Sequence, residues 1–198
     1  CGGSGMYPLI QILAAKGYEI SGSDVLDGSI IARAEMGVKV SLGHAADNVI
    51  GADLVVYSAA IAKDNVELNA AASYGIPTVE RSVLLGYVSR LYKDSICVSG
   101  THGKTTTTSM CTHIFMAAEQ DPTVMIGGTL PLLHSGYRVG HGDTIILESC
   151  EYCNSFLSFF PTVAVILNIE ADHLDFFKDL DDVEHSFRAF ADRVPESG

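Results

Sequence analysis

The stretch "SICVSGTHGKTTTT", residues 95–108, decides the fold of the second half of the chain. An apolar run leads into a turn with glycines, and a lysine followed by threonines opens a helical pattern. Strand, glycine turn and helix in this order are typical of phosphate-binding loops, where backbone N–H groups and the helix dipole hold an anion. The usual motif has another glycine five positions before Gly103, but Val98 stands there.

These residues predict a nucleotide site. Lys104 would reach the β- and γ-phosphates as a point charge, and the Thr105 hydroxyl would ligate Mg²⁺. The alternative, a tight turn with a capping threonine and an exposed lysine, leaves G-K-T-T directly after a strand unexplained. The predicted phosphate-binding residues are Gly100, Thr101, His102, Gly103, Lys104, Thr105 and Thr106.

Composition restricts the class of protein. The chain has 198 residues, 47% of them hydrophobic, which suffices for one large or two small folded domains. With 12 basic and 24 scattered acidic residues the net charge is −12, so nucleic acid is not expected as a partner. No apolar run is long enough to span a membrane. An anionic ligand must therefore be held by local devices such as loop N–H groups, a helix N-terminus or a metal ion.

The five cysteines are odd in number and irregularly spaced, which predicts reduced thiols and a cytoplasmic location. Cys150 and Cys153 form a C-x-x-C pair, but no second cysteine pair or histidine pair completes a zinc site. We interpret them as ordinary thiols at a strand end, with metal binding or redox chemistry as the alternative.

Strands and helices alternate along the chain, which predicts an α/β fold with parallel sheets covered by helices. A Rossmann-like domain is expected at residues 1–93, and a break at Lys93 and Asp94 starts a P-loop-type α/β domain at 94–198. In the first domain we expect helices at 6–17, 29–37, 65–75 and 81–92, and strands at 18–24, 38–44, 53–61 and 77–80.

The second domain continues this alternation. One helix is expected from Lys104 to about Ala118. Residues at helical spacing predict a last helix with one apolar face, formed by Val183, Phe187, Phe190 and Val194. The expected strands are 95–100, 122–128, 143–150 and 162–170.

Polar residues follow two of these strands, at the edge where open α/β sheets place their ligands. Glu148 and Glu151 stand at the end of one strand, and Asn168 and His173 follow the next. Glu148 is a natural partner of Thr105 on Mg²⁺, and His173 could hold a second ion, so that two metals would neutralise a transferred phosphoryl group. Each residue alone could be an ordinary strand-end residue, but their joint placement favours a site.

The first residues, "CGGSGM" at 1–6, match the end of a G-x-G-x-x-G turn, and Asp24 stands where a ribose-binding acid would in a dinucleotide fold. This signature leaves a nicotinamide cofactor, another diphosphate and a plain tight turn open. A diphosphate-type domain followed by an ATP-type loop suggests an enzyme joining a group carried on a nucleotide diphosphate to a group activated by ATP. Both ends are expected to be cut, because the first turn lacks its strand and the last segment stops abruptly.

Six ordered blocks resemble the Mur ligase family: "GGSGM", "SGSD", "LGH", "VVYSAAI", "GTHGKTTTT" and "NIEADHLDFF". They cover essentially the whole chain, and the alanine-adding branch is the most similar. Members of this family are similar in carrying G-T-[HN]-G-K-[ST]-T. This motif has no glycine five positions before its second glycine, which accounts for Val98 at that position. The resemblance implies an ATP- and Mg²⁺-dependent ligation in bacterial peptidoglycan precursor synthesis. ATP would phosphorylate the carboxylate of UDP-N-acetylmuramate, and the amine of L-alanine would attack the acyl phosphate.

Carried over by position, the resemblance implies that Lys104, Glu148 and His173 are catalytic. Thr105 and Glu148 would hold the first Mg²⁺, and His173 the second. Glu151 and Asn168 would face the muramoyl end of the substrate. The implied contacts of the UDP diphosphate are Gly2, Gly3, Ser4, Gly5 and Met6, with Asp24, His44 and Ser58 around it.

The chain also departs from the family pattern. Many members read E-A-D-E-S-D-A-S-F where this chain reads "ESCEYCNSF", and residues 181–193 have no lysine for the carbamylation that some relatives use. The third domain, which in the family closes over both ligands, is expected to lie outside this chain, so this chain alone is not expected to turn over. The alternatives are a recycling ligase that attaches a tripeptide to the same UDP-sugar, folylpolyglutamate synthase, and a non-catalytic nucleotide-binding module.

Overall fold

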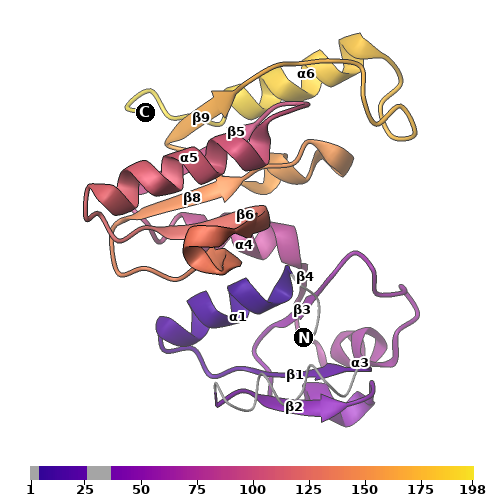
Figure 1. Ribbon diagram of the computed structural model, residues 1–198. Coiled ribbons are helices and arrows are strands. Elements are labelled where there is room, and N and C mark those ends of the chain that lie inside the picture. Colours follow the sequence, from indigo (N-terminus) through magenta and orange to yellow (C-terminus); the bar gives the residue numbers. More distant parts are fainter. Residues whose placement is uncertain (1–4, 26–36) are drawn as a thin grey trace. The chain divides into compact units, whose positions relative to one another are not determined.

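The structure is a computed structural model that describes residues 5–25 and 37–198 of the chain. It divides into two compact units, Cys1–Leu84 and Leu85–Gly198 (Figure 1). Both units are mixed α/β bodies with parallel strands, which confirms the predicted fold class. In the described ranges, no helix is both long and apolar enough to cross a membrane. The helix expected at 29–37 lies almost entirely outside the described residues.

The first unit holds two short parallel sheets. β1 pairs with β2 from Ser21 and Lys39 onward, and β3 pairs with β4 from Val55 and Thr78 onward. The sequence predicts longer strands; the observed ones have three or four residues each, so each ladder has few hydrogen bonds. The elements are α1 Met6–Ala15, β1 Ser21–Asp24, β2 Lys39–Leu42, η1 Ala46–Val49, β3 Val55–Tyr57, α3 Val66–Tyr74 and β4 Thr78–Glu80, and α4 Arg81–Ser89 runs on into the second unit.

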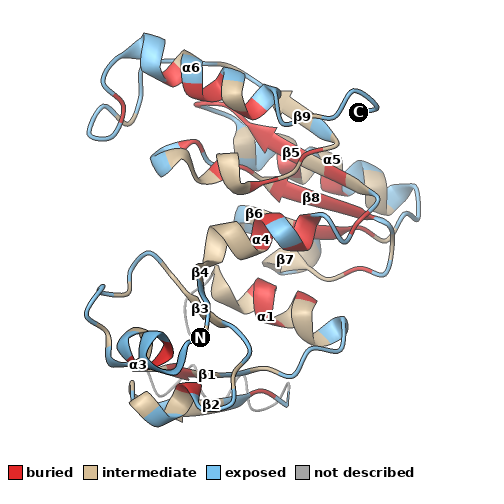
Figure 2. Cartoon of the chain, turned by 180° about the vertical axis from the view of Figure 1, so that it is seen from behind, coloured by how far each residue is buried: buried red, intermediate tan, exposed pale blue. Residues whose placement is uncertain are grey.

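The second unit is built on a five-stranded sheet in the order β7-β6-β8-β5-β9. All neighbours are parallel except β7, which runs antiparallel to β6 at the edge and is not predicted by the sequence. Figure 2 shows the central strands as the most buried part of the unit. The strands are β5 Asp94–Ser99, β6 Thr123–Leu130, β7 Ser135–Arg138, β8 Thr144–Glu148 and β9 Val163–Ile166.

Helices cover this sheet. α5, Lys104–Ala117, packs on β5, β6 and β8, and its bounds agree with the helix predicted after the glycine turn. α6, Leu180–Ala191, packs on β9 and on the short helix η3, Tyr152–Ser158. Its contact with η3 is made by aromatic rings. Val194, predicted on the apolar face of this helix, lies beyond its end because the helix stops at Ala191.

Strand register brings three segments to one edge of the sheet. Val98 of β5 lies opposite Glu148 of β8, and Ser99 lies opposite Ile166 of β9. All three strands are parallel, so the turns that follow them emerge side by side. The glycine loop after β5 therefore lies between the acidic end of β8 and the polar segment after β9.

Candidate active site

The glycine loop connects the carboxyl end of β5 to α5. Gly100 has a φ of 136° and Gly103 a φ of 85°, which are conformations that favour glycine. A Cβ on Gly100 would lie 3.0 Å from the Cβ of Leu167, so glycine also permits the close approach of the segment after β9. Along α5, which is fully described, no side chain caps the N-terminus and no acidic residue occupies the first turn. The first N–H groups of this helix are therefore open to an anion.

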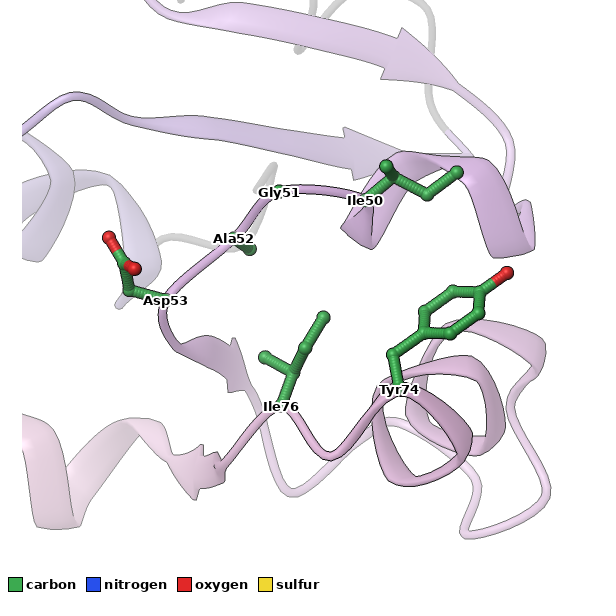
Figure 3. Close-up of a pocket in the computed structure, with 6 residues that line it drawn as sticks. All are labelled: Ile50, Gly51, Ala52, Asp53, Tyr74 and Ile76. Atoms are coloured by element: carbon green, nitrogen blue, oxygen red, sulfur yellow. The ribbon is translucent and has the colours of Figure 1, made fainter.

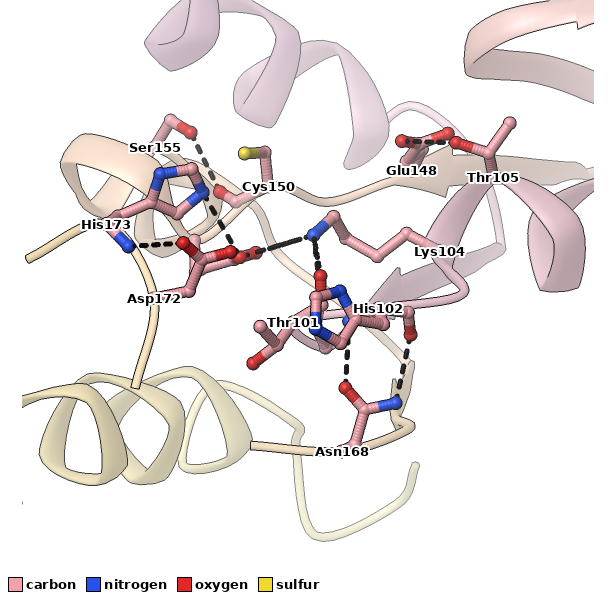
Figure 4. A network of polar contacts seen from close by, with 12 residues as sticks. Thr101, His102, Lys104, Thr105, Glu148, Cys150, Ser155, Asn168, Asp172 and His173 are labelled. Carbon is pink, nitrogen blue, oxygen red and sulfur yellow. Dashed lines mark hydrogen bonds and ion pairs between the residues drawn. The ribbon is translucent and has the colours of Figure 1, made fainter. Parts of the chain in front are cut away.

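Lys104, the first residue of α5, folds back toward the loop (Figure 4). Its Nζ donates to the carbonyl oxygens of Gly100 at 2.7 Å and Thr101 at 3.1 Å, and to Glu151 Oε1 at 3.2 Å. Only 14% of the Lys104 side chain and 2% of the Glu151 side chain are exposed. Glu151 Oε2 is 3.1 Å from Lys104 Nζ, yet among the described residues it has no partner with hydrogen-bond geometry. A buried ion pair thus places an ammonium group beside the helix N-terminus.

Thr105 and Glu148, the residues predicted to share a magnesium ion, are in contact. Thr105 Oγ1 donates to Glu148 Oε1 at 3.0 Å (Figure 4). The Gly127 N–H donates to Glu148 Oε2 at 2.7 Å. Neighbouring oxygens in an octahedral Mg²⁺ shell are about 3 Å apart, because each lies about 2.1 Å from the ion. The two residues therefore fit this ion. The described residues contain no group of three or more His, Cys, Asp or Glu side chains suited to a metal, so water and phosphate oxygens would complete the shell.

His173 lies at the other side of Glu151. Its Nε2 is 3.7 Å from Glu151 Oε1, and its backbone has a φ of 53°, in the left-handed region. The ring packs on Tyr152 with centroids 4.8 Å apart, and the Tyr152 hydroxyl donates to Asp175 Oδ2 at 2.9 Å. This hydrogen bond and the charge of Asp175 raise the pKa of Tyr152. Tyr152 is a residue that sequence reasoning missed, since its only signal is its position in "ESCEYCNSF".

Asn168 contacts the loop itself. Its Oδ1 accepts from the His102 N–H at 2.8 Å, and its Nδ2 donates to the His102 carbonyl at 3.0 Å (Figure 4). The side chain of His102 points instead toward Glu170, with 3.7 Å between Nε2 and Oε2. The structure thus brings Lys104, Thr105, Glu148, Glu151, Asn168 and His173 together around one loop.

The predicted diphosphate residues belong to the first unit. Gly2, Gly3 and Ser4 lie outside the described residues, whereas Gly5 precedes α1 and Met6 begins it. Asp24 ends β1, and its carbonyl accepts from the Gly43 N–H at 2.7 Å, so the expected ribose-binding acid does stand at a strand end.

His44 belongs to a polar cluster in the first unit. Its Nδ1 is 3.0 Å from both Ser23 Oγ and Glu67 Oε2, while Asn48 Nδ2 donates to Glu67 Oε1 at 2.7 Å. Burial disfavours the ionised form of Glu67, but hydrogen bonds from Asn48, Ser23 and His44 outweigh it and lower the pKa of the carboxyl. Between described residues, no hydrogen bond joins Ser58 to this cluster. Sequence reasoning missed Glu67 because it lies within a helix.

A separate cavity of about 480 Å³ lies at the amino ends of β3 and β4 in the first unit. Figure 3 shows its lining, in which Ile50, Tyr74 and Ile76 lie on one side and the carboxylate of Asp53 lies apart from them. None of the predicted site residues lines it. The lining residues are Ile50, Gly51, Ala52, Asp53, Tyr74 and Ile76.

The fold and the loop site define a class of protein. Residues 1–93 match the family model "Mur ligase family, catalytic domain", and residues 98–198 match "Mur ligase middle domain". The chain belongs to the Mur ligase family.

Individual proteins of the family are also similar to this chain. The chain is 48% identical over its whole length to a UDP-N-acetylmuramate–L-alanine ligase of Caldanaerobacter subterraneus subsp. tengcongensis, and 50% identical to one of Agathobacter rectalis. It spans 43% of the length of each of these relatives.

Two solved structures of ligases superpose on this chain. The UDP-N-acetylmuramate-alanine ligase of Thermotoga maritima superposes with a TM-score of 0.83 at 28% identity, covering 98% of this chain and 46% of that one. The UDP-N-acetylmuramate:L-alanyl-γ-D-glutamyl-meso-diaminopimelate ligase of Neisseria meningitides gives a TM-score of 0.85 at 26% identity, covering 100% and 67%.

Proposed function

We propose that this chain supplies the UDP-sugar-binding and ATP-binding parts of a bacterial, cytoplasmic ligase. The reaction joins the carboxylate of UDP-N-acetylmuramate to the amine of L-alanine in peptidoglycan precursor synthesis, with ATP cleaved to ADP and phosphate. The single observation that carries the proposal is the loop site, in which Lys104 and the Thr105–Glu148 pair flank an uncapped helix N-terminus. Identities of 48% and 50% to two alanine ligases support the choice of substrates.

The domain division that we propose follows the same lines, with residues 1–93 for the UDP-sugar and residues 94–198 for ATP. Family matches to 1–93 and 98–198 support it, although the compact units of the structure meet at Leu84 and Leu85, inside α4. In the first part Gly2–Met6, Asp24, His44 and Ser58 are the proposed UDP-sugar contacts.

The chemistry of the site begins with the loop. N–H groups at the start of α5 bind the phosphates, since their own helix offers them no acceptor. Lys104 Nζ has three protons and now donates to three oxygens. It must release one of them, such as Glu151, to reach the transferred phosphoryl group. Its charge then stabilises negative charge that grows as the muramoyl carboxylate attacks.

Metal binding is assigned to the Thr105–Glu148 pair and to the nearby His173. Thr105 and Glu148 would hold Mg²⁺, and His173, beside Glu151, would hold a second ion. Bound metal supplies charge neutralisation for the phosphoryl oxygens. Phosphorylation turns the carboxylate oxygen into part of a phosphate leaving group, which the amine of L-alanine displaces to form the amide. Glu151 and Asn168 are proposed near the muramoyl end of this site.

The assay for this proposal uses the complete product of the gene, because the chain spans 43% of its relatives. Phosphate release is followed with ATP, Mg²⁺ and UDP-N-acetylmuramate, and with L-alanine, the tripeptide L-alanyl-γ-D-glutamyl-meso-diaminopimelate, or no amine. We expect release only when L-alanine is present, and none from Lys104→Ala. Release with the tripeptide alone would assign the chain to the recycling ligases, and no release at all would leave a nucleotide-binding module.

A further inference from the structure

The peptide group of His102 is held on both sides by one side chain. Asn168 Oδ1 accepts from the His102 N–H at 2.8 Å, and Asn168 Nδ2 donates to the carbonyl oxygen of the same residue at 3.0 Å. The assignment of the two amide atoms is fixed by these partners, because an N–H needs an acceptor and a carbonyl needs a donor. The Asn168 side chain therefore makes the same pair of hydrogen bonds with the His102 peptide group that the backbone of a neighbouring strand would make.

This contact extends the pairing of β5 with β9 beyond the ends of both strands. The Leu167 N–H donates to the Ser99 carbonyl at 3.0 Å, and the Thr101 N–H donates to the Asn168 carbonyl at 3.1 Å. The Glu170 N–H donates to Thr101 Oγ1 at 2.9 Å. Together with the two Asn168 bonds, these contacts fix the loop from its first residue to His102.

A fixed loop matters for binding an anion. Its two glycines have access to more backbone conformations than other residues, so ordering them on ligand binding would cost free energy. Hydrogen bonds made before the ligand arrives reduce that cost. They also direct the N–H groups, because the His102 N–H is engaged by Asn168 while those from Gly103 to Thr106 stay open to phosphate; the Thr107 N–H already donates to the Gly103 carbonyl.

We propose that Asn168 is a positioning residue of the phosphate loop, which sets the His102 peptide and thereby the direction of the N–H groups that bind nucleotide phosphates. This inference rests on the proposed function, in which the loop binds ATP. It assigns to Asn168 an effect on nucleotide affinity that acts through the loop backbone. The contact with the muramoyl end that is proposed above for the same residue would alter the affinity for the UDP-sugar, so the two effects are measured separately.

Two substitutions separate the parts of this contact. Asn168→Ala removes both hydrogen bonds, whereas Asn168→Asp keeps the acceptor for the His102 N–H but turns a carboxylate oxygen toward the His102 carbonyl. Gln120→Glu is the matched control, because it makes the same amide-to-carboxylate change on an exposed side chain of the second unit. The readouts on the full chain are amide hydrogen exchange of residues 99–106 without ligand, and titration with a non-hydrolysable ATP analogue plus Mg²⁺.

We expect both Asn168 variants to bind the analogue about tenfold more weakly, a loss typical of one or two hydrogen bonds, while their thermal midpoints stay close to that of the unmodified chain. The His102 amide should exchange about tenfold faster in Asn168→Ala, and Gln120→Glu should change neither quantity. Unchanged exchange and affinity would overturn the proposal, as would a loss of affinity confined to the UDP-sugar. If the unmodified chain binds no nucleotide, the proposed function fails. The exchange rate of the His102 amide in Asn168→Ala then still decides whether Asn168 positions the loop: faster exchange supports this role, and unchanged exchange overturns it.

Discussion

Lys104 Nζ lies 3.1 Å from Glu151 Oε2, and the Glu151 carboxylate is almost completely buried. A buried carboxylate is stable only with a partner, since the interior solvates its charge poorly. The Lys104 ammonium therefore both stabilises the buried Glu151 carboxylate and supplies the positive charge that the proposed reaction uses. An incoming phosphoryl group would compete with Glu151 for the same ammonium.

Lys104→Ala should destabilise the second unit as well as abolish nucleotide binding. Removing one partner of a fully buried pair costs about 3–5 kcal/mol, and we expect about 2–3 kcal/mol here because Lys104 is partly exposed. Urea unfolding measures this loss. The control is the double variant Lys104→Met/Glu151→Gln, which removes both charges and should regain most of the stability without regaining nucleotide affinity. An equally unstable double variant would contradict the buried-charge argument.

Gly127→Ala should displace the carboxylate of Glu148. A Cβ at this position would lie 2.6 Å from Glu148 Oε1, too close for the present contact with Thr105 to persist. We expect the nucleotide affinity in the presence of Mg²⁺ to fall by about tenfold, while the affinity without Mg²⁺ changes little. Calorimetric titration with and without the ion distinguishes the two. Equal affinities for the variant and the unmodified chain in the presence of Mg²⁺ would remove Glu148 from the metal site.

The cluster around Glu67 predicts a pH dependence of stability in the first unit. Although burial alone would raise it, the pKa of Glu67 is lowered in the folded state by hydrogen bonds from Asn48, Ser23 and His44. A lowered carboxyl pKa adds stability above the unfolded value, about 4.3, and this stability is lost as the pH falls through the folded value. The free energy of unfolding of the unmodified chain should therefore fall more steeply below about pH 4.5 than that of the Glu67→Gln variant. Parallel losses in both proteins would show that Glu67 does not contribute.

Cysteine reactivity should differ sharply within the second unit. Burial raises the pKa of Cys97 to about 11. Cys150 and Cys153 are exposed, although partial burial of the Cys150 thiol also raises its pKa. At about pH 8 the buried thiol has almost no thiolate and little access to reagent. Iodoacetamide labelling followed by peptide mass spectrometry should modify Cys150 and Cys153 in the native chain, and Cys97 only after unfolding. Native labelling of Cys97 at the rate of the denatured chain would place it outside the core.

An aromatic stack anchors α6. Phe156 stacks on Phe190 with centroids 4.6 Å apart, and Phe187 meets Phe156 edge-on at 5.3 Å. Phe190→Ala should cost about 3–5 kcal/mol, since all three rings are buried and the cavity would be only partly refilled. Phe176→Ala, at a side chain that is 43% exposed, is the control and should cost less than half as much in a urea titration.

The loop site was predictable because its signals are local in the sequence. The apolar run, glycine turn and G-K-T-T fix β5 and α5, and parallel strands bring Glu148 to the loop without any knowledge of side-chain contacts. β7 was missed because "SGYR" has no apolar alternation; glycine lets it approach β6, where a Cβ on Gly136 would lie 2.5 Å from the Gly128 carbonyl oxygen.

Contacts between distant segments were not predictable in this way. Glu67 reaches His44, in the loop after β2, from helix α3, and Asn168 reaches the His102 peptide only because Gly100 lets the two segments approach. Both contacts depend on backbone positions that no local pattern encodes. The residue types suggested polar roles, but not the partners.

The most direct test of the proposed reaction follows one oxygen atom. UDP-N-acetylmuramate labelled with heavy oxygen in its carboxylate is incubated with ATP, Mg²⁺, L-alanine and the complete gene product, and the released phosphate is examined by mass spectrometry. If the carboxylate attacks ATP and L-alanine then displaces phosphate, each released phosphate carries one labelled oxygen, and Lys104→Ala releases none. Amide formation with unlabelled phosphate would contradict the acyl phosphate and the role assigned to the loop.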